Sequence, residues 1–310
     1  MKYPWLKAVE DEFTERLEHG RLPHALLLSG PRGTGKQDLA MQFVAGILCL
    51  ESDWPACGCC RSCQLLVSGA HPDCHVITFE EHPKTGDLRK GLIVDQVRRL
   101  IATLNLTTTI SRSKAALIYP AEAMNTNAAN ALLKTLEEPP GDTVIILVSS
   151  DPARLPATIR SRCQKLNVRQ PEFALALDWL QNQAGLDPQD AKAALQAAAG
   201  SPLAALRLHE EGITDQYVLL KDILEKLGAG RMGSGSALAA LADVEPDILW
   251  SWISLLTAGK LKSGVYPVQR ARELSKLQSA ADTNRKLVPT PVRKDFLLQD
   301  WLIQWARLSA

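Results

Sequence analysis

The sequence contains no long apolar run, although 46% of its 310 residues are hydrophobic. A helix that crosses a membrane needs about 20 consecutive apolar residues, and no stretch approaches that length. The segment from Met1 to Glu10 also lacks the apolar core of a secretory signal peptide. These absences predict a cytoplasmic protein with no membrane partner.

Neither sign of charge is in excess. The 35 Lys and Arg residues nearly balance the 34 Asp and Glu residues, so the net charge gives no sign of a strongly basic surface that binds nucleic acid. Contacts with DNA are therefore expected to be local or shared with partners. The length is ample for a large core and predicts two or three domains.

Cysteine is too sparse for a disulfide framework, with seven residues in the whole chain, but five of them crowd into one short segment. Cys49, Cys57, Cys60 and Cys63 have a spacing that supplies four thiolates, enough to close the tetrahedral shell of a structural zinc ion. Cys59 lies in the same segment and is an alternative ligand. The competing interpretation is a redox C-x2-C pair, which normally opens a helix in a thioredoxin-like βαβ unit, and that context is missing.

A glycine-rich segment, G-P-R-G-T-G-K-Q, follows an apolar run and precedes a helical pattern. This strand–loop–helix context is the one that a phosphate-binding loop requires. Gly30, Gly33 and Gly35 let backbone N–H groups converge on phosphate oxygens, and Lys36 adds a positive charge. The alternative is a glycine-rich turn that binds no ligand.

The groups that hydrolysis needs are missing near this loop. Gln37 stands where a phosphate-binding loop carries Ser or Thr for Mg²⁺, and a neutral amide is a poor ligand for that ion. Tyr119 and Pro120 stand at the end of a predicted buried strand, where a nucleotide hydrolase carries its acidic pair. The sequence therefore predicts a loop that holds phosphate without hydrolysing it.

Short apolar strands alternate with helices as far as about residue 165. Strands are expected near 25–28, after His71, and near 115–119 and 144–148, with helices near 4–20, 38–48, 93–104 and 127–138. Such alternation around a phosphate loop predicts an α/β domain with a parallel sheet over residues 1–165 and a cysteine insertion at 49–63.

Helical patterns make up the remainder of the chain. Three short ones, at 172–184, 188–199 and 202–210, predict a small helical domain over residues 166–210. A Gly/Ser-rich interruption at 228–236 divides the helical region 211–310. This last region contains four of the seven tryptophans, and we expect at least two to fill its own core: Trp250, Trp252, Trp301 and Trp305.

Several motifs, in this order, resemble the bacterial clamp-loader ATPase family of AAA+ proteins. They are the phosphate loop, the cysteine segment, the run Asn130-Ala-Leu-Leu-Lys-Thr-Leu-Glu-Glu-Pro-Pro140, and Ser161-Arg162-Cys163. The resemblance implies a RecA-like module at 1–165, a small helical lid at 166–210 and an all-α collar at 211–310. It also implies that Arg162 is an arginine finger presented to ATP on an adjacent subunit.

The resemblance further implies a hetero-pentamer with ATP-hydrolysing gamma/tau subunits and a delta subunit. Such a complex places a sliding clamp on primed DNA within a replicative DNA polymerase holoenzyme, a nucleotidyltransferase. Hydrolysing members carry Ser or Thr, an Asp-Glu pair and a lid arginine, whereas this chain has Gln37, Tyr119-Pro120 and Leu203. It resembles a subunit whose ATP binding is vestigial and which does not hydrolyse ATP.

Two rival functions stay open at this point. The chain could be an active phosphate-loop ATPase with an unusual metal shell, which ATP turnover by the isolated chain would reveal. It could also be a zinc-dependent DNA-binding module, which requires salt-sensitive DNA affinity, and the balanced charge argues against that function. Without the resemblance, Arg162 reads as a solvated or ion-paired arginine.

Overall fold

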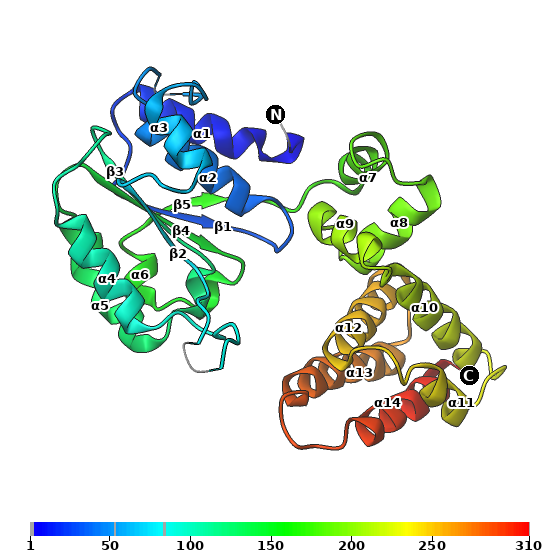
Figure 1. The fold of residues 1–310 in the computed structure, drawn as a ribbon. Coiled ribbons are helices and arrows are strands. Elements are labelled where there is room, and N and C mark those ends of the chain that lie inside the picture. Colours follow the sequence, from blue (N-terminus) through cyan, green and yellow to red (C-terminus); the bar gives the residue numbers. More distant parts are fainter. Residues whose placement is uncertain (1–2, 53, 83–84, 310) are drawn as a thin grey trace. The chain divides into compact units, whose positions relative to one another are not determined.

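The structure is a computed structural model that describes residues 3–52, 54–82 and 85–309 (Figure 1). The chain divides into two compact units, Met1–Leu175 and Ala176–Ala310. The boundary between them falls inside α7 (Phe173–Asn182), and each unit is described by itself. The predicted boundary near residue 210 lies within the second unit and stays a prediction.

The first unit is built on a five-stranded parallel sheet with the strand order β2-β3-β4-β1-β5. The strands are β1 (Ala25–Ser29), β2 (Cys74–Ile77), β3 (Lys114–Ile118), β4 (Thr143–Ser149) and β5 (Gln164–Asn167). Every residue of β1, β3 and β4 is buried, because helices cover both faces of the sheet. The predicted parallel α/β domain is confirmed.

The helices of this unit lie on both faces of the sheet (Figure 1). They are α1 (Lys7–Glu18), α2 (Lys36–Leu48), α3 (Arg61–Val67), α4 (Val94–Leu104), α5 (Thr126–Glu137) and α6 (Ala157–Arg160), with the 3-10 turns η1 (Pro4–Leu6), η2 (Ala121–Ala123) and η3 (Pro152–Arg154). α4 and α5 cover one face, where Leu100 and Leu132 join alternate strand residues in one buried cluster. α1 and α2 pack together through the stacked rings of Phe13 and Phe43, 3.7 Å apart.

Three local features differ from the sequence-based expectations. The sequence pattern does not indicate β5, because only Leu166 of its four residues is buried and the strand lies at the sheet edge. Nor does the pattern indicate α3, which lies within and just after the cysteine segment. The interruption predicted at 228–236 is too long, because Gly228 still belongs to α10 and Ser234 begins α11.

The second unit is helical throughout its described part. Beyond α7 it contains α8 (Pro188–Ala197), α9 (Pro202–Glu210), α10 (Thr214–Gly228), α11 (Ser234–Ala240), α12 (Pro246–Ser263), α13 (Val268–Leu287) and α14 (Lys294–Ser309). All four tryptophans of residues 211–310 are buried in its core, which confirms the expectation for at least two of them. Across all described residues, no helix combines the length and apolarity needed to span a bilayer.

Hydrogen bonds of the buried indoles tie the helices of this unit together. Trp252 Nε1 donates to the Ala197 carbonyl at 2.9 Å, and Trp305 Nε1 donates to the Leu224 carbonyl at 3.0 Å. Each bond satisfies an N–H group that burial removes from water. Because the first bond joins α12 to α8, the segments predicted as collar and lid share one core within this unit.

Candidate functional site

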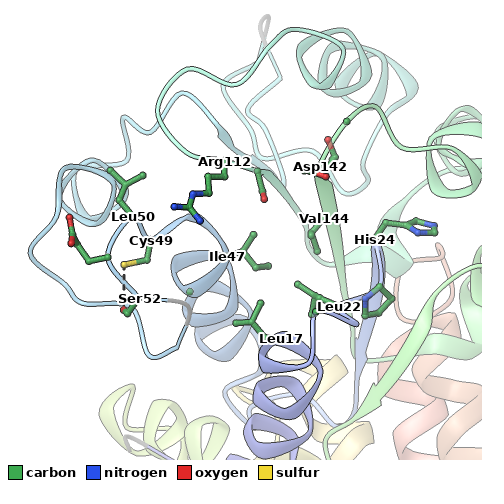
Figure 2. A pocket seen from close by; sticks show the side chains of 17 residues that line it. Leu17, Leu22, His24, Ile47, Cys49, Leu50, Ser52, Arg112, Asp142 and Val144 are labelled. Atoms are coloured by element: carbon green, nitrogen blue, oxygen red, sulfur yellow. Dashed lines mark hydrogen bonds between the residues drawn. The ribbon is translucent and has the colours of Figure 1, made fainter.

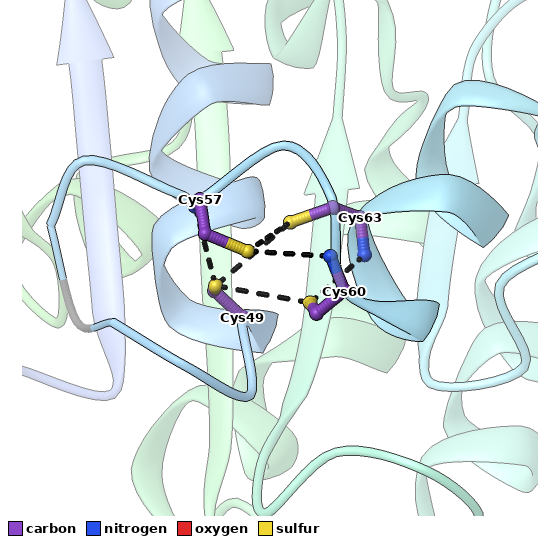
Figure 3. A group of neighbouring side chains, drawn as sticks. All are labelled: Cys49, Cys57, Cys60 and Cys63. Atoms are coloured by element: carbon purple, nitrogen blue, oxygen red, sulfur yellow. Dashed lines mark hydrogen bonds between the residues drawn. The ribbon is translucent and has the colours of Figure 1, made fainter.

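Four cysteines gather where α2 ends and α3 begins (Figure 3). Cys49 directly follows α2, Cys57 and Cys60 lie in the connecting loop, and Cys63 lies in the first turn of α3. Their sulfur atoms point toward one another and all lie within 4.8 Å. The structure therefore brings together the four cysteines that the spacing selects.

The sulfur positions fit a tetrahedral zinc ion. Four sulfurs held at about 2.3 Å from a zinc ion are about 3.8 Å apart. The Sγ atom of Cys49 lies 3.9 Å from that of Cys60 and 3.8 Å from that of Cys63, and the Sγ atoms of Cys57 and Cys63 are 3.9 Å apart. These distances match the zinc geometry, and they exceed by far the S–S bond of about 2.0 Å in a disulfide.

Backbone N–H groups support three of the four sulfurs as thiolates. The N–H groups of Cys57, Cys60 and Cys63 donate to the Sγ atoms of Cys49, Cys57 and Cys60 at 3.4, 3.3 and 3.5 Å. Although burial raises the pKa of Cys49, its hydrogen-bond donors lower the pKa to about 5. Burial raises the pKa of Cys63 to about 12, so Cys63 needs a bound cation to become a thiolate. Cys59 is exposed on the outside of the group, with its Sγ 3.6 Å from that of Cys57.

A buried hydrogen-bond network joins this loop to the start of two strands. The Leu48 carbonyl, next to Cys49, accepts from the hydroxyls of Ser62 and Ser111 at 2.6 and 2.8 Å. His71 Nε2 lies 2.8 Å from Ser62 Oγ, and His71 Nδ1 accepts from the Asp73 N–H at 3.0 Å. Since both hydroxyls already donate to the carbonyl, His71 is neutral with its proton on Nε2.

Protonation of His71 should destabilise this network. In the folded chain His71 is only 5% exposed, and this burial lowers its pKa. In the unfolded chain a histidine has a pKa of about 6.5. The unfolded chain therefore takes up the proton first, and stability falls as the pH decreases through about 6.5. Urea unfolding midpoints near pH 7.5 and pH 5.5 should differ less in His71→Gln than in the wild type. An unchanged difference would show that His71 does not contribute to the pH dependence of stability. Some pH dependence should remain in His71→Gln, because burial also lowers the pKa of His75.

The glycine-rich loop follows β1 and leads into α2, as predicted. Gly30 has φ +153°, and a Cβ atom there would lie 2.2 Å from the Val168 carbonyl oxygen. Gly35 has φ +83°, and a Cβ atom there would lie 2.6 Å from the Tyr3 ring. Both positions thus need glycine because backbone or an aromatic ring approaches closely. Gly33 also has positive φ.

Two aromatic side chains from the N-terminal segment lie against this loop. Tyr3 Oη donates to Asp38 Oδ2 at 2.6 Å, and Trp5 Nε1 donates to the Thr34 carbonyl at 2.8 Å. Their rings stack 5.5 Å apart. The loop is therefore held in shape by protein groups, and the sequence pattern alone gives no sign of this contact between Tyr3 and Gly35.

Lys36 is turned into the protein. Its side chain is buried, and Nζ donates to the Pro31 carbonyl of the same loop at 2.5 Å. Burial lowers the pKa of Lys36 to about 8, and Arg32 acts in the same direction, while Glu122 opposes both. Glu122 is a buried carboxylate that the sequence analysis missed; its Oε1 accepts from the Ser150 N–H at 3.1 Å.

The positions expected to serve Mg²⁺ and water carry no acidic group. Gln37 is exposed at the start of α2, and Tyr119 follows β3 with its N–H bonded to the Ile77 carbonyl at 2.9 Å. Pro120 comes next and contributes neither a donor nor a carboxylate.

Arg162 lies just beyond α6 and forms an ion pair with Glu137 at the end of α5. Its Nε donates to Glu137 Oε1 at 2.5 Å, its Nη2 lies against the same oxygen, and its Nη1 donates to the Thr158 carbonyl at 3.0 Å. The Arg162 side chain is 33% exposed. It is therefore both anchored and accessible, a combination that the sequence could not show.

Comparison with known proteins identifies the family. The family model for "DNA polymerase III, delta subunit" matches residues 5–172. The chain is 37% identical to DNA polymerase III subunit delta' of Pseudomonas aeruginosa, over 97% of this chain and 89% of that protein. It belongs to the delta-prime family of DNA polymerase III subunits. This result confirms the resemblance to clamp-loader proteins and narrows it to delta-prime.

More distant relatives include other DNA polymerase III subunits. The chain is 30% identical to DNA polymerase III subunit tau/gamma of Haemophilus influenzae, over 77% of this chain but 36% of that protein. A solved DNA polymerase III gamma subunit-related protein of Thermotoga maritima covers 97% of this chain and 100% of its own, with a TM-score of 0.51 and 15% identity. At that identity the match shows the fold alone.

A cavity of 610 Å³ lies beside the amino ends of the strands, at the end of the sheet away from the glycine-rich loop (Figure 2). Its lining includes Arg112, Asp142 and His24, and His24 Nε2 is already bonded to the Leu136 carbonyl at 2.8 Å. α/β folds bind their ligands at the carboxyl ends of the strands, whereas this cavity adjoins their amino ends. It shares Cys49 with the cysteine cluster and contains no other predicted site residue.

Proposed function

We propose that this chain is a non-hydrolysing delta-prime subunit of a clamp loader, which loads a sliding clamp on primed DNA during replication. Its contribution to ATP hydrolysis is Arg162, supplied in trans to a neighbouring subunit. The observation that carries this proposal is the accessible, anchored guanidinium of Arg162. Membership of the delta-prime family supports the proposed clamp-loader assembly, in which an arginine of one subunit can reach ATP on its neighbour.

The phosphate loop supports a subunit that does not hydrolyse ATP. Lys36 is bonded to a carbonyl of its own loop, Gln37 is a poor Mg²⁺ ligand, and neither Tyr119 nor Pro120 activates water. Gly30, Gly33, Gly35 and Lys36 thus form a vestigial phosphate loop. Nothing in the described geometry favours the rival in which this chain is itself an active ATPase.

The cysteine cluster supports a structural zinc ion held by Cys49, Cys57, Cys60 and Cys63. Four thiolates close the coordination shell and leave no position for a substrate, so the ion would supply fold stability and no chemistry. The cluster joins the end of α2 to the start of α3. The metal therefore stabilises an insertion in the α/β module.

The partners proposed are gamma/tau ATPase subunits and a delta subunit in a hetero-pentamer. Residues 166–210 would act as the lid and residues 211–310 as the collar that joins the ring. The test is to mix the chain with gamma/tau and delta and to separate the mixture by size exclusion. We expect the chain to elute in one complex with both partners, and separate elution of the intact chain would reject the proposal.

Replacing Lys36 with Ala should leave clamp loading by the assembled complex nearly intact. Lys36 already donates to the Pro31 carbonyl, and no hydrolysis at this loop is lost with it. The measurement is the rate of clamp loading, compared with a complex in which the phosphate-loop lysine of a gamma/tau subunit is replaced instead. That second change should abolish most loading, and an equal loss from Lys36→Ala would mean that this loop is active.

A further inference from the structure

Glu137 occupies an unfavourable place in its own helix. It is the last residue of α5, which ends there because the non-helical Glu138 and then Pro139 follow. The carboxyl end of a helix carries partial negative charge, so a carboxylate in the last turn is disfavoured unless a cation compensates it. Arg162 is that cation. The helix dipole therefore does not favour a glutamate at position 137, whereas the ion pair with Arg162 does.

The ion pair leaves two donors of Arg162 free. A guanidinium has five N–H donors, of which Glu137 takes one on Nε and one on Nη2, and the Thr158 carbonyl takes one on Nη1. The remaining N–H of Nη2 and that of Nη1 have no partner among the described residues. Arginine can contact a phosphate with one donor on each of these two nitrogens, the terminal fork of the guanidinium.

We infer that Glu137 is a positioning residue that holds Arg162 with this fork directed away from its own chain. The inference rests on the proposed role of Arg162 as an arginine finger. Glu137 occupies the Nε side of the guanidinium, while the Thr158 carbonyl, which also accepts from Ser161 Oγ at 3.2 Å, fixes Nη1. Because the side chains of Arg162 and Glu137 are 33% and 47% exposed, their ion pair contributes little to the stability of the fold. Its effect is expected on the rate of the reaction that Arg162 assists.

The test is the rate of clamp loading by the assembled complex carrying Glu137→Ala. Freeing an arginine side chain restores rotamer entropy that the anchor had removed, so we expect a roughly tenfold slower rate with an unchanged KM for ATP. Glu137→Gln retains an acceptor oxygen and should lose less. Glu138→Gln removes the same charge from the adjacent exposed residue and should match the wild type.

A double variant separates positioning from a structural role. If Glu137 acts through Arg162, the Glu137→Ala, Arg162→Ala chain should load clamps no more slowly than Arg162→Ala alone. A further loss in the double variant, a faster rate in Glu137→Ala, or a wild-type rate in Glu137→Ala beside a slow Arg162→Ala would each overturn the inference. A wild-type rate in Arg162→Ala would instead reject the proposed function itself.

Discussion

Replacing Arg162 with Ala should slow clamp loading by the assembled complex more than it slows total ATP hydrolysis. An arginine supplied by a neighbour stabilises the charge that develops on the transferred phosphoryl group, an effect worth roughly 10³–10⁵ in rate in GTPases. In the proposed role, the loss should be confined to the one ATP site that this subunit would face, so total hydrolysis should fall only in part. Loading requires the sites to act together and should fall further. Both rates are measured on the same assembled complex.

Two control variants sharpen this result. Arg162→Lys keeps the charge but not the two-bond contact, and should therefore resemble Arg162→Ala. Arg154→Ala removes an exposed arginine from the 3-10 turn before α6, whose guanidinium has no partner in the described part of the chain, and should load normally. Wild-type loading by Arg162→Ala would reject the finger role. Failure of that variant to assemble would mean that Arg162 serves the subunit interface.

We expect one zinc ion per chain in the wild type and none in the Cys60→Ala, Cys63→Ala double variant. Two thiolates cannot close a tetrahedral shell, and structural zinc sites contribute on the order of 10 kcal/mol of binding free energy. Cys60 also caps α3 by accepting from the Cys63 N–H, so the helix should fray when both are replaced. The measurement is elemental analysis of the purified protein.

Cys59→Ala is the matched control for this experiment. Cys59 is exposed and lies outside the group of four, so its replacement should leave one zinc ion per chain. Metal-free wild-type protein, or equal zinc in the double variant, would contradict the site. Loss of zinc in Cys59→Ala would mean that the ligand set includes the fifth cysteine.

The sequence predicts the sheet where burial leaves a clear pattern. β1, β3 and β4 are buried on both faces and read as continuous apolar runs. β5 shows no such run because it lies at the edge of the sheet, with Leu166 its one buried residue. The four tryptophans of the last helical region are also predictable, since large apolar side chains fill the core of their own unit.

The candidate sites are predictable only as far as the chain keeps their residues close in sequence. The spacing of four cysteines within one segment predicts that they cluster. That Cys59 lies exposed outside this cluster follows only from the three-dimensional path of the loop. The Arg162 and Glu137 pair joins residues that lie far apart in the chain, and Tyr3 reaches the glycine-rich loop in the same way. Such contacts depend on how the helices pack, which no local pattern encodes.

ATP hydrolysis in the presence of the sliding clamp and primed DNA shows whether this chain is a non-hydrolysing subunit that supplies an arginine to a neighbour. The rate is measured for this chain alone, for gamma/tau with delta, and for all of them together. We expect negligible turnover by the chain alone, and a higher rate when it joins gamma/tau and delta, because a non-hydrolysing subunit with an arginine finger would complete one of their ATP sites. Turnover by the isolated chain, or an unchanged rate when it is added, would show that the chain does not act as such a subunit.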